Sequence, residues 1–246
     1  MNKLITGVVV GLVMGACSAV SAQSISAGGG VYLGYDVVGQ GASADYTNIY
    51  GQPVTHALGY PTTQMGLHAF LDATFVEVGV GIGFGSGKER SKYIVDGKEL
   101  PYFQTGFSSE LASVTTLGIS VLGKYNVPVR EGMEVFPAIG FEYQLCLGGE
   151  LNVTQNSQKN DWFTTEPYKT LYGAEAGDLS YFALKLGVGY DYILSGNMFV
   201  RALALYNIGF PSEFSKIYAD KVIDDDDYDA ALVQGISVKL GIGFKF

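Results

Sequence analysis

Apolar residues alternate with glycine or polar residues in eight separate stretches of the chain, and this period of two predicts β-strands. In the stretch FVEVGVGIGFGSGKE, residues 75–89, all even positions from 76 to 84 are apolar, and all odd positions from 79 to 87 are glycine. No window of the chain shows a convincing helical stripe. The expected strands lie near residues 25–36, 66–73, 75–89, 115–125, 135–147, 180–192, 197–208 and 236–246.

The glycines of this stretch end in Gly-Lys, which raises the possibility of a phosphate-binding loop. A nucleotide-binding loop needs either G-x-x-x-x-G-K-[ST] or G-x-G-x-x-G at the start of a helix. Here the position five before Gly87 is Ile82, and Lys88 is followed by Glu89 rather than by Ser or Thr. The pattern therefore predicts a strand with one apolar face and one face that is nearly free of side chains.

The connections between the expected strands alternate in length. The short links lie at residues 72–74, 126–134 and 193–196, and the long ones lie at about 38–65, 86–112, 148–178 and 210–230. Strands of roughly ten residues, joined by short turns at one end and long loops at the other, are typical of bacterial outer-membrane barrels. We therefore predict an all-β fold, an eight-stranded antiparallel transmembrane β-barrel with short periplasmic turns and four long extracellular loops.

Composition favours lipid over water around this barrel. Only 16% of the residues are charged, and the chain contains 34 Gly and 17 Tyr, whereas charged residues make up about 25% of a soluble domain. A soluble ligand-binding barrel would need polar residues on its outer face, and the alternating stretches do not supply them. In a lipid-embedded barrel the apolar face meets hydrocarbon, the small face fits a narrow lumen, and closure leaves no unpaired strand edge.

The first 22 residues have the features of a secretory signal peptide, with Lys3 before an apolar run and small residues ending at Ala22. We expect its removal to leave a barrel domain of residues 23–246, although Cys17 offers an alternative as a lipidation site. Without the signal peptide only Cys146 remains, so no internal disulfide is expected. The net charge of −9 and the lack of a basic patch argue against nucleic-acid binding.

Eight charged residues fall on the small, inward-facing side of the expected strands. They are the acids Asp72, Glu77, Glu142 and Asp191 and the bases Lys124, Lys185, Arg201 and Lys239. Buried charges persist when they are paired and hydrogen-bonded, so we expect a neutralised network that fills the lumen, with Lys124 and Glu142 paired across neighbouring strands. The alternatives are an ion or proton pathway through these charges, or a transport cavity left open by the inward glycines.

Other candidate sites have little support. The run DDDDYD at residues 224–229 lacks the central glycine and closing glutamate of a calcium loop, so we interpret it as a solvated acidic tip, with weak divalent-cation binding as the alternative. The two histidines are His56, in the first long loop, and His68, which faces inward. No His/Ser pair can be placed. We therefore expect no metal, no cofactor and no enzymatic activity.

Several segments together resemble small eight-stranded outer-membrane barrels of the OmpX/OmpW-like kind. They are GLHAFLDATFVEVGVGIGF, VLGKYNVPV, VFPAIGFEYQ and the terminal KLGIGFKF. The resemblance implies a location in the outer membrane, and Phe244 and the final Phe246 resemble the signal read by the barrel-assembly machinery. We expect a monomer with a structural or surface-interaction role, in which the loops contact an extracellular ligand. The alternative is a narrow channel or transporter for small hydrophobic molecules.

Overall fold

The computed structural model describes residues 25–40, 43–47, 51–57, 60–88, 92–95, 98–100, 107–156, 163–172, 180–210 and 232–246. Within these ranges the strands are β1 (Ile25–Gln40), β2 (Ser43–Thr47), β3 (Pro53–Ala57), β4 (Tyr60–Ala73), β5 (Val76–Lys88), β6 (Lys92–Val95), β7 (Lys98–Leu100), β8 (Phe107–Lys124), β9 (Val127–Arg130), β10 (Met133–Asn156), β11 (Phe163–Tyr172), β12 (Tyr181–Ser195), β13 (Met198–Gly209) and β14 (Leu232–Lys245). Among the described residues, no helix is long and apolar enough to cross a membrane.

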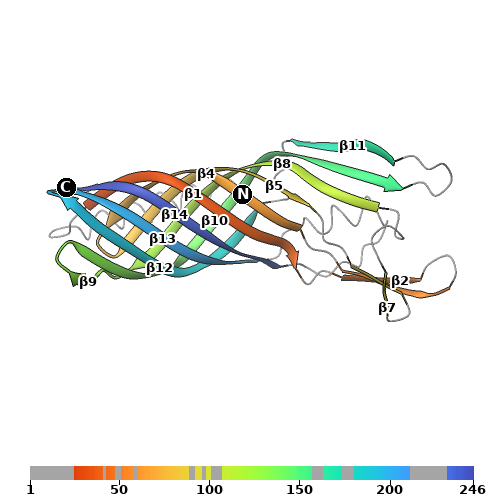
Figure 1. Cartoon of the computed structure of the whole chain (residues 1–246), viewed down its shortest axis with the longest axis horizontal. Coiled ribbons are helices and arrows are strands. Elements are labelled where there is room, and N and C mark those ends of the chain that lie inside the picture. The colour runs from red at the N-terminus through yellow and green to blue at the C-terminus, as the bar shows by residue number, and fades with distance from the viewer. Residues whose placement is uncertain are drawn as a thin grey trace, which may run out of the picture.

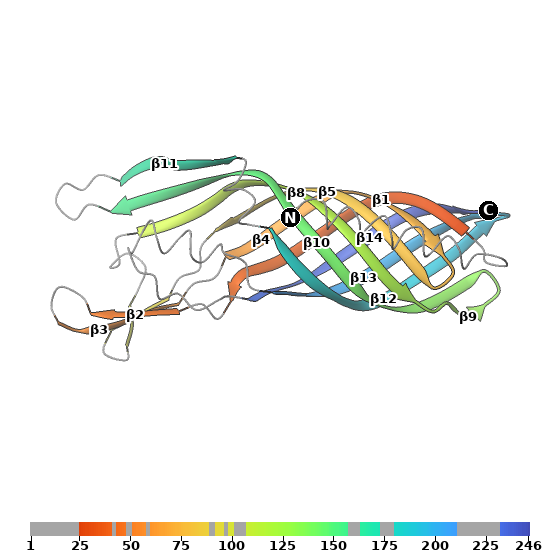
Figure 2. The ribbon, with the colours of Figure 1, turned by 180° about the vertical axis from the view of Figure 1, so that it is seen from behind.

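Eight of these strands form a closed antiparallel barrel, which confirms the predicted fold class. The order around the barrel is β1, β4, β5, β8, β10, β12, β13 and β14, and β14 pairs again with β1. The strands are inclined to the long axis of the barrel, as Figures 1 and 2 show. Because every barrel strand has a partner on both sides, the backbone polar groups are satisfied without water, as the interior of a membrane requires.

One end of the barrel, here called the turn end, contains the short connections and the C-terminus (Figure 1). Thr74 and Phe75 join β4 to β5, and Gly196 and Asn197 join β12 to β13. The link from β8 to β10 is longer than the other two, since it includes β9, which pairs with the start of β10. The tip of this hairpin turns at Gly132, whose φ of 73° favours glycine.

At the opposite end, here called the outer end, several strands continue beyond the barrel wall. β10 has 24 residues, more than twice the ~9–11 that cross a membrane. β8 and β10 remain paired as far as Phe107 and Gln155, and β11 pairs with the outer part of β10. β2, β3, β6 and β7 form a separate four-stranded sheet. Three of the four long connections expected from the sequence thus contain paired strands.

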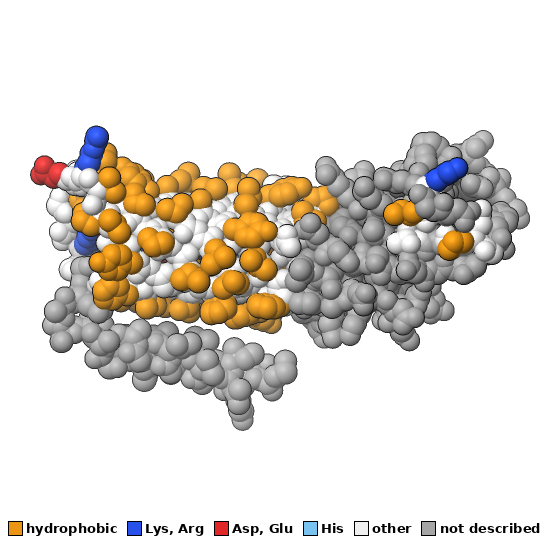
Figure 3. All heavy atoms as spheres, turned by 90° about the horizontal axis from the view of Figure 1, so that it is seen from below, with side chains coloured by type: hydrophobic (Ala, Val, Ile, Leu, Met, Phe, Trp, Pro, Cys, Tyr) orange, Lys and Arg blue, Asp and Glu red, His pale blue; other side chains and the backbone are white. Residues whose placement is uncertain are grey.

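Apolar side chains cover the outer wall of the barrel, and Figure 3 shows them around the barrel half of the molecule. Val80 and Leu186, predicted to face lipid, are 48% and 36% exposed. Stacked aromatic rings lie toward both ends of this surface. Phe75 and Tyr125 stack at 6.2 Å near the turn end, whereas Phe182 stacks on Phe141 at 5.3 Å and on Phe210 at 6.0 Å toward the outer end. Aromatic girdles of this kind flank the apolar band of membrane barrels.

Candidate functional site in the barrel lumen

The inward face of the barrel strands divides into three zones along the axis. The turn-end cluster comprises Asp72, Glu77, Lys124, Asp191 and Arg201. The apolar layer comprises Leu122, Phe136, Ala138, Leu203 and Leu205. The polar chamber, toward the outer end, is built around Glu142, Lys185 and Lys239. The order follows from the strands themselves, because Leu203 and Leu205 lie between Arg201 and Asn207 on β13, and Leu122 lies between Lys124 and Ser120 on β8.

Arg201 is the centre of the turn-end cluster and is 2% exposed. Its Nε donates to Asp191 Oδ1 at 2.7 Å, and its second terminal nitrogen donates to Asp191 Oδ2 at 2.6 Å and to Asp72 Oδ2 at 2.9 Å. The other terminal nitrogen contacts Glu77 Oε2 at 2.5 Å. Lys124 Nζ lies 2.5 Å from Asp72 Oδ2. One guanidinium therefore connects carboxylates from β4, β5 and β12 across the lumen, in the fork geometry that suits arginine.

Three phenylalanine rings surround the same guanidinium. Its Cζ lies 4.6 Å from the ring centroid of Phe70, 5.0 Å from that of Phe136 and 5.1 Å from that of Phe199. Lys124 Nζ lies 4.5 Å from the centroid of Phe136. A cation over an aromatic face gains about 0.5–2 kcal/mol, and more of this when water is excluded. The rings thus pack the lumen and stabilise the two cations without adding charge.

Inward glycines provide the space that these rings occupy. A Cβ on Gly189 would overlap the ring of Phe136, and a Cβ on Gly243 would overlap the ring of Phe199. Tyr32 fills the equivalent space beside Gly83. The open cavity that the glycines could have left, one of the alternatives from the sequence, is therefore occupied by aromatic side chains at these positions.

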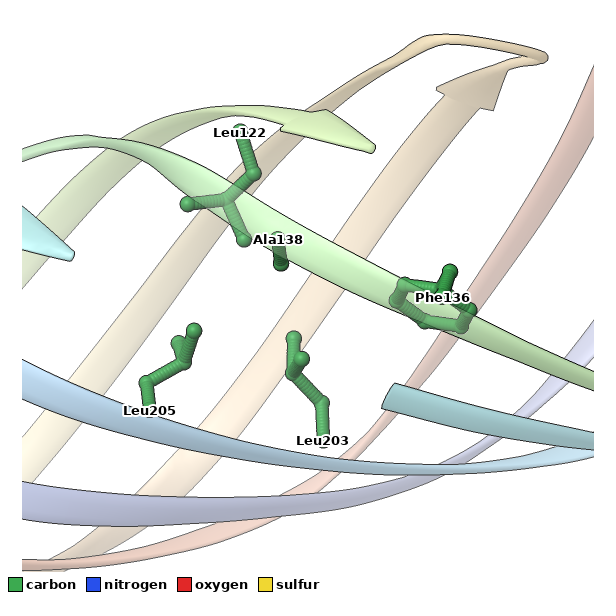
Figure 4. Close-up of a cluster of buried hydrophobic side chains, with 5 residues drawn as sticks. All are labelled: Leu122, Phe136, Ala138, Leu203 and Leu205. Atoms are coloured by element: carbon green, nitrogen blue, oxygen red, sulfur yellow. The ribbon is translucent and has the colours of Figure 1, made fainter. Parts of the chain in front are cut away.

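The apolar layer adjoins the turn-end cluster, since the ring of Phe136 contacts Arg201 and Lys124. In Figure 4, Leu122 and Ala138 point toward Leu203 and Leu205, and Phe136 lies beside them. Phe136 is fully buried, and Leu122 and Leu203 are 1% and 2% exposed. The five residues come from β8, β10 and β13, so the layer lies on the side of the lumen that these strands form. Apolar side chains there offer an ion no replacement for its hydration shell.

The polar chamber contains the second group of charges. Glu142 Oε1 lies 2.8 Å from Lys185 Nζ, and Glu142 Oε2 lies 3.6 Å from Lys239 Nζ. Toward the outer end, Gln144 accepts a hydrogen bond from Tyr181 and donates one to Gln64 at 2.8 Å. Glu142, Gln144, Lys185, Lys239 and Gln64 line a cavity of ≈ 30 Å³, which has room for water-sized molecules only.

The expected pair between Lys124 and Glu142 does not form, and the register of the strands explains why. In the β8–β10 pairing Lys124 lies opposite Ala138, whereas Glu142 lies opposite Ser120. Four residues along a strand are about 13 Å, which is too far for direct contact. Lys124 pairs instead with Asp72 across the lumen, and Glu142 pairs with Lys185 and Lys239.

A wider vestibule of ≈ 270 Å³ lies below the turn-end cluster. Its lining includes Asp72, Arg201 and Lys124 from the cluster, together with Glu134 and Lys245. Glu134 Oε1 lies 3.2 Å from Lys245 Nζ, and Glu134 Oε2 accepts a hydrogen bond from Asn126 at 2.7 Å. The vestibule therefore ends at the ionic cluster and does not reach the polar chamber.

The structure places all eight predicted lumen charges on the inward face, and each takes part in an ion pair. Asp36, on the inward face of the first strand, was not among the predicted network charges, yet it is 3% exposed and accepts a hydrogen bond from Asn207 at 2.9 Å. Its position two residues after Gly34, on the small-residue face of the first strand, was the available signal. The side chain of His56, the acidic run 224–229 and the signal segment with Cys17 lie outside the described residues. Among the described residues, no cluster of three or more His, Cys, Asp or Glu could hold a metal ion.

Comparison with solved structures finds similarity to several outer-membrane proteins. OprG from Pseudomonas aeruginosa is 13% identical, with a TM-score of 0.42, and the match covers 92% of this chain and 96% of OprG. The outer membrane protease OmpT from Escherichia coli is 10% identical, with a TM-score of 0.41 and coverage of 91% and 97%. Ail, the attachment invasion locus protein of Yersinia pestis, is 12% identical, with a TM-score of 0.35 and coverage of 91% and 99%.

The closed antiparallel barrel and its apolar outer wall decide the class of protein without these similarities. The chain is an outer-membrane β-barrel. No protein-family model and no curated protein sequence matches it. The similarity to the solved barrels is too low to indicate a function, which we infer instead from the lumen and the charges of this chain.

Proposed function

We propose that this chain is a closed barrel with a structural or surface-interaction role, and that its outer segments make contact with extracellular molecules. The sealed lumen carries this proposal. From the turn end a solute would meet the Arg201 network, then the apolar layer, and then a chamber with room for water-sized molecules only. A transporter for small hydrophobic molecules would need a continuous path through these zones, so we place that function second.

The distribution of charge supports a role for the outer end. The segments 41–59, 89–112, 148–179 and 211–231 contain 17 Asp and Glu but 7 Lys and Arg, whereas the remaining residues from 23 onward contain 7 of each. Outside these four segments the charges of residues 23–246 cancel, and the four segments hold the whole net charge of −10 that residues 23–246 carry; Lys3 brings the full sequence to −9. Such a surface attracts cationic partners and repels anionic ones, and salt weakens both effects.

The surface role can be tested on cells that display the barrel, with fluorescent poly-lysine as a cationic probe. We expect cells with the full barrel to bind more probe than control cells without it. We also expect this binding to fall at low salt in a variant that combines four changes, Asp224→Asn, Asp225→Asn, Asp226→Asn and Asp227→Asn. Glu131→Gln, at the exposed tip of the turn-end hairpin, serves as the control and should leave binding unchanged. Equal binding to cells with and without the barrel would contradict the proposed surface role.

We further propose that the barrel is a monomer and that the barrel-assembly machinery reads its C-terminus. Phe244 and Phe246 are 50% and 80% exposed on the lipid-facing side. We predict that Phe246→Ala lowers insertion into the outer membrane of cells more than it lowers the stability of the refolded barrel. Phe210→Ala, which removes an exposed ring at the outer end, is the matched control. Equal insertion of Phe246→Ala and the unchanged protein, measured in isolated outer membranes, would rule out this signal.

A further inference from the structure

Four residues that line the chamber each have a buried polar atom without a hydrogen-bond partner among the described residues. The atoms are His68 Nε2, Thr116 Oγ1, Asn207 Oδ1 and Ser237 Oγ. A buried polar group without a partner costs about 1–3 kcal/mol, and four of them around one cavity call for a shared partner. The cavity they line has a volume of ≈ 30 Å³, and a water molecule needs roughly 10–15 Å³ of such space.

Two of these atoms can only accept hydrogen bonds. The ring of His68 makes a hydrogen bond to the backbone of Leu240, and because Nε2 has no partner, Nδ1 is the donor and Nε2 holds the lone pair. The amide nitrogen of Asn207 donates to Asp36 Oδ1 at 2.9 Å, which fixes the orientation of this side chain and leaves Oδ1 as an acceptor. The occupant of the chamber must therefore donate hydrogen bonds.

We propose that the polar chamber is an internal hydration site, in which about two water molecules donate hydrogen bonds to His68 Nε2 and Asn207 Oδ1 and contact Ser237 Oγ. The charges around the cavity oppose an ion in this position. Lys185 and Lys239 repel a cation, and Glu142 and Asp36 repel an anion, so the lining has no net charge. The volume excludes an organic ligand. Water satisfies the acceptors without adding charge.

This site is independent of the proposed surface role, and it depends on the apolar layer below it. The chamber and the turn-end vestibule share no lining residue, and the proposed waters lie between the apolar layer and the Gln64, Gln144 and Tyr181 network. Waters enclosed in this way make about three hydrogen bonds each and are costly to remove.

The chain offers a sharp test because it contains two histidines. His56→Asn, in the outer sheet, leaves His68 as the single histidine. The variant is labelled with ¹⁵N-histidine, placed in lipid nanodiscs and measured by NMR. We expect the neutral form of the His68 ring, with its proton on Nδ1. We also expect a cross-relaxation peak between this ring and long-lived water. Ser237→Ala should weaken this water peak and keep the Nδ1 proton, whereas Leu186→Ala on the lipid-facing wall should change neither.

Two results would overturn the proposal. One is a proton on Nε2, which would remove the acceptor on which the site is built. The other is the absence of a water peak in a barrel whose Nδ1 proton shows that the ring has its expected hydrogen bond. If Ser237→Ala does not fold, the spectrum of the His56→Asn barrel alone decides between these outcomes.

Discussion

Replacing Arg201 with methionine should destabilise the barrel by about 3–5 kcal/mol, because the change leaves buried carboxylates without their partner. Arg201 contacts Asp72, Glu77 and Asp191 at 2.5–2.9 Å, and all four side chains are at most 6% exposed. Methionine keeps much of the apolar volume among the phenylalanine rings, so the loss of stability comes mainly from the missing charge. The measurement is denaturant unfolding of the refolded barrel in lipid vesicles.

Lys245→Met is the matched control for this experiment. Lys245 pairs with Glu134 at 3.2 Å, but the side chains are 28% and 22% exposed, so water and salt screen the pair. Pairs near the surface contribute roughly 0–1 kcal/mol. In addition, Asp191→Asn combined with Arg201→Met should recover part of the lost stability, since one of the stranded charges is removed. A cost for Arg201→Met no larger than that for Lys245→Met would show that the cluster is not a buried network.

An arginine at Val80 should cost about 2–4 kcal/mol, the range for a cation placed on the lipid face near the midplane of the bilayer. Val80 lies in the middle of β5, and its side chain faces away from the lumen with 48% of its surface exposed. The same folding titration in lipid vesicles measures this change.

Phe75→Arg is the control for Val80→Arg. Phe75 is 50% exposed in the turn just before β5, where its ring stacks on Tyr125, so its cost should be smaller, because the penalty falls toward the interface. A neutral effect of Val80→Arg would mean that the faces of β5 are assigned the wrong way round.

The sequence was sufficient to predict the barrel and the two faces of its strands. The period-two pattern placed Val80 and Leu186 outward, and it placed Lys185 and Arg201 inward, because alternation is set by the backbone of each strand. The outer strands β2, β3, β6 and β7 were not predicted, since short segments without clear alternation do not stand out from loops.

The sequence was not sufficient for the internal architecture of the lumen. Leu203, Leu205 and Phe136 are apolar residues on the inward face, so they interrupt the expected polar side and resemble lipid-facing residues. The pairing of Lys124 with Asp72 joins strands that are not neighbours in the barrel, and it depends on strand stagger and lumen width. A pattern along one strand contains neither quantity, which is why Lys124 was assigned to Glu142.

Conductance across a planar lipid bilayer shows whether the lumen of the barrel is closed. The refolded barrel is inserted, its presence in the bilayer is verified, and a porin added afterwards shows that the bilayer reports open channels. We predict no steady current above background for the barrel alone, because the Arg201 cluster and the apolar layer together block the path. Stable single-channel conductance from the unmodified barrel would contradict the closed lumen and would favour the transporter.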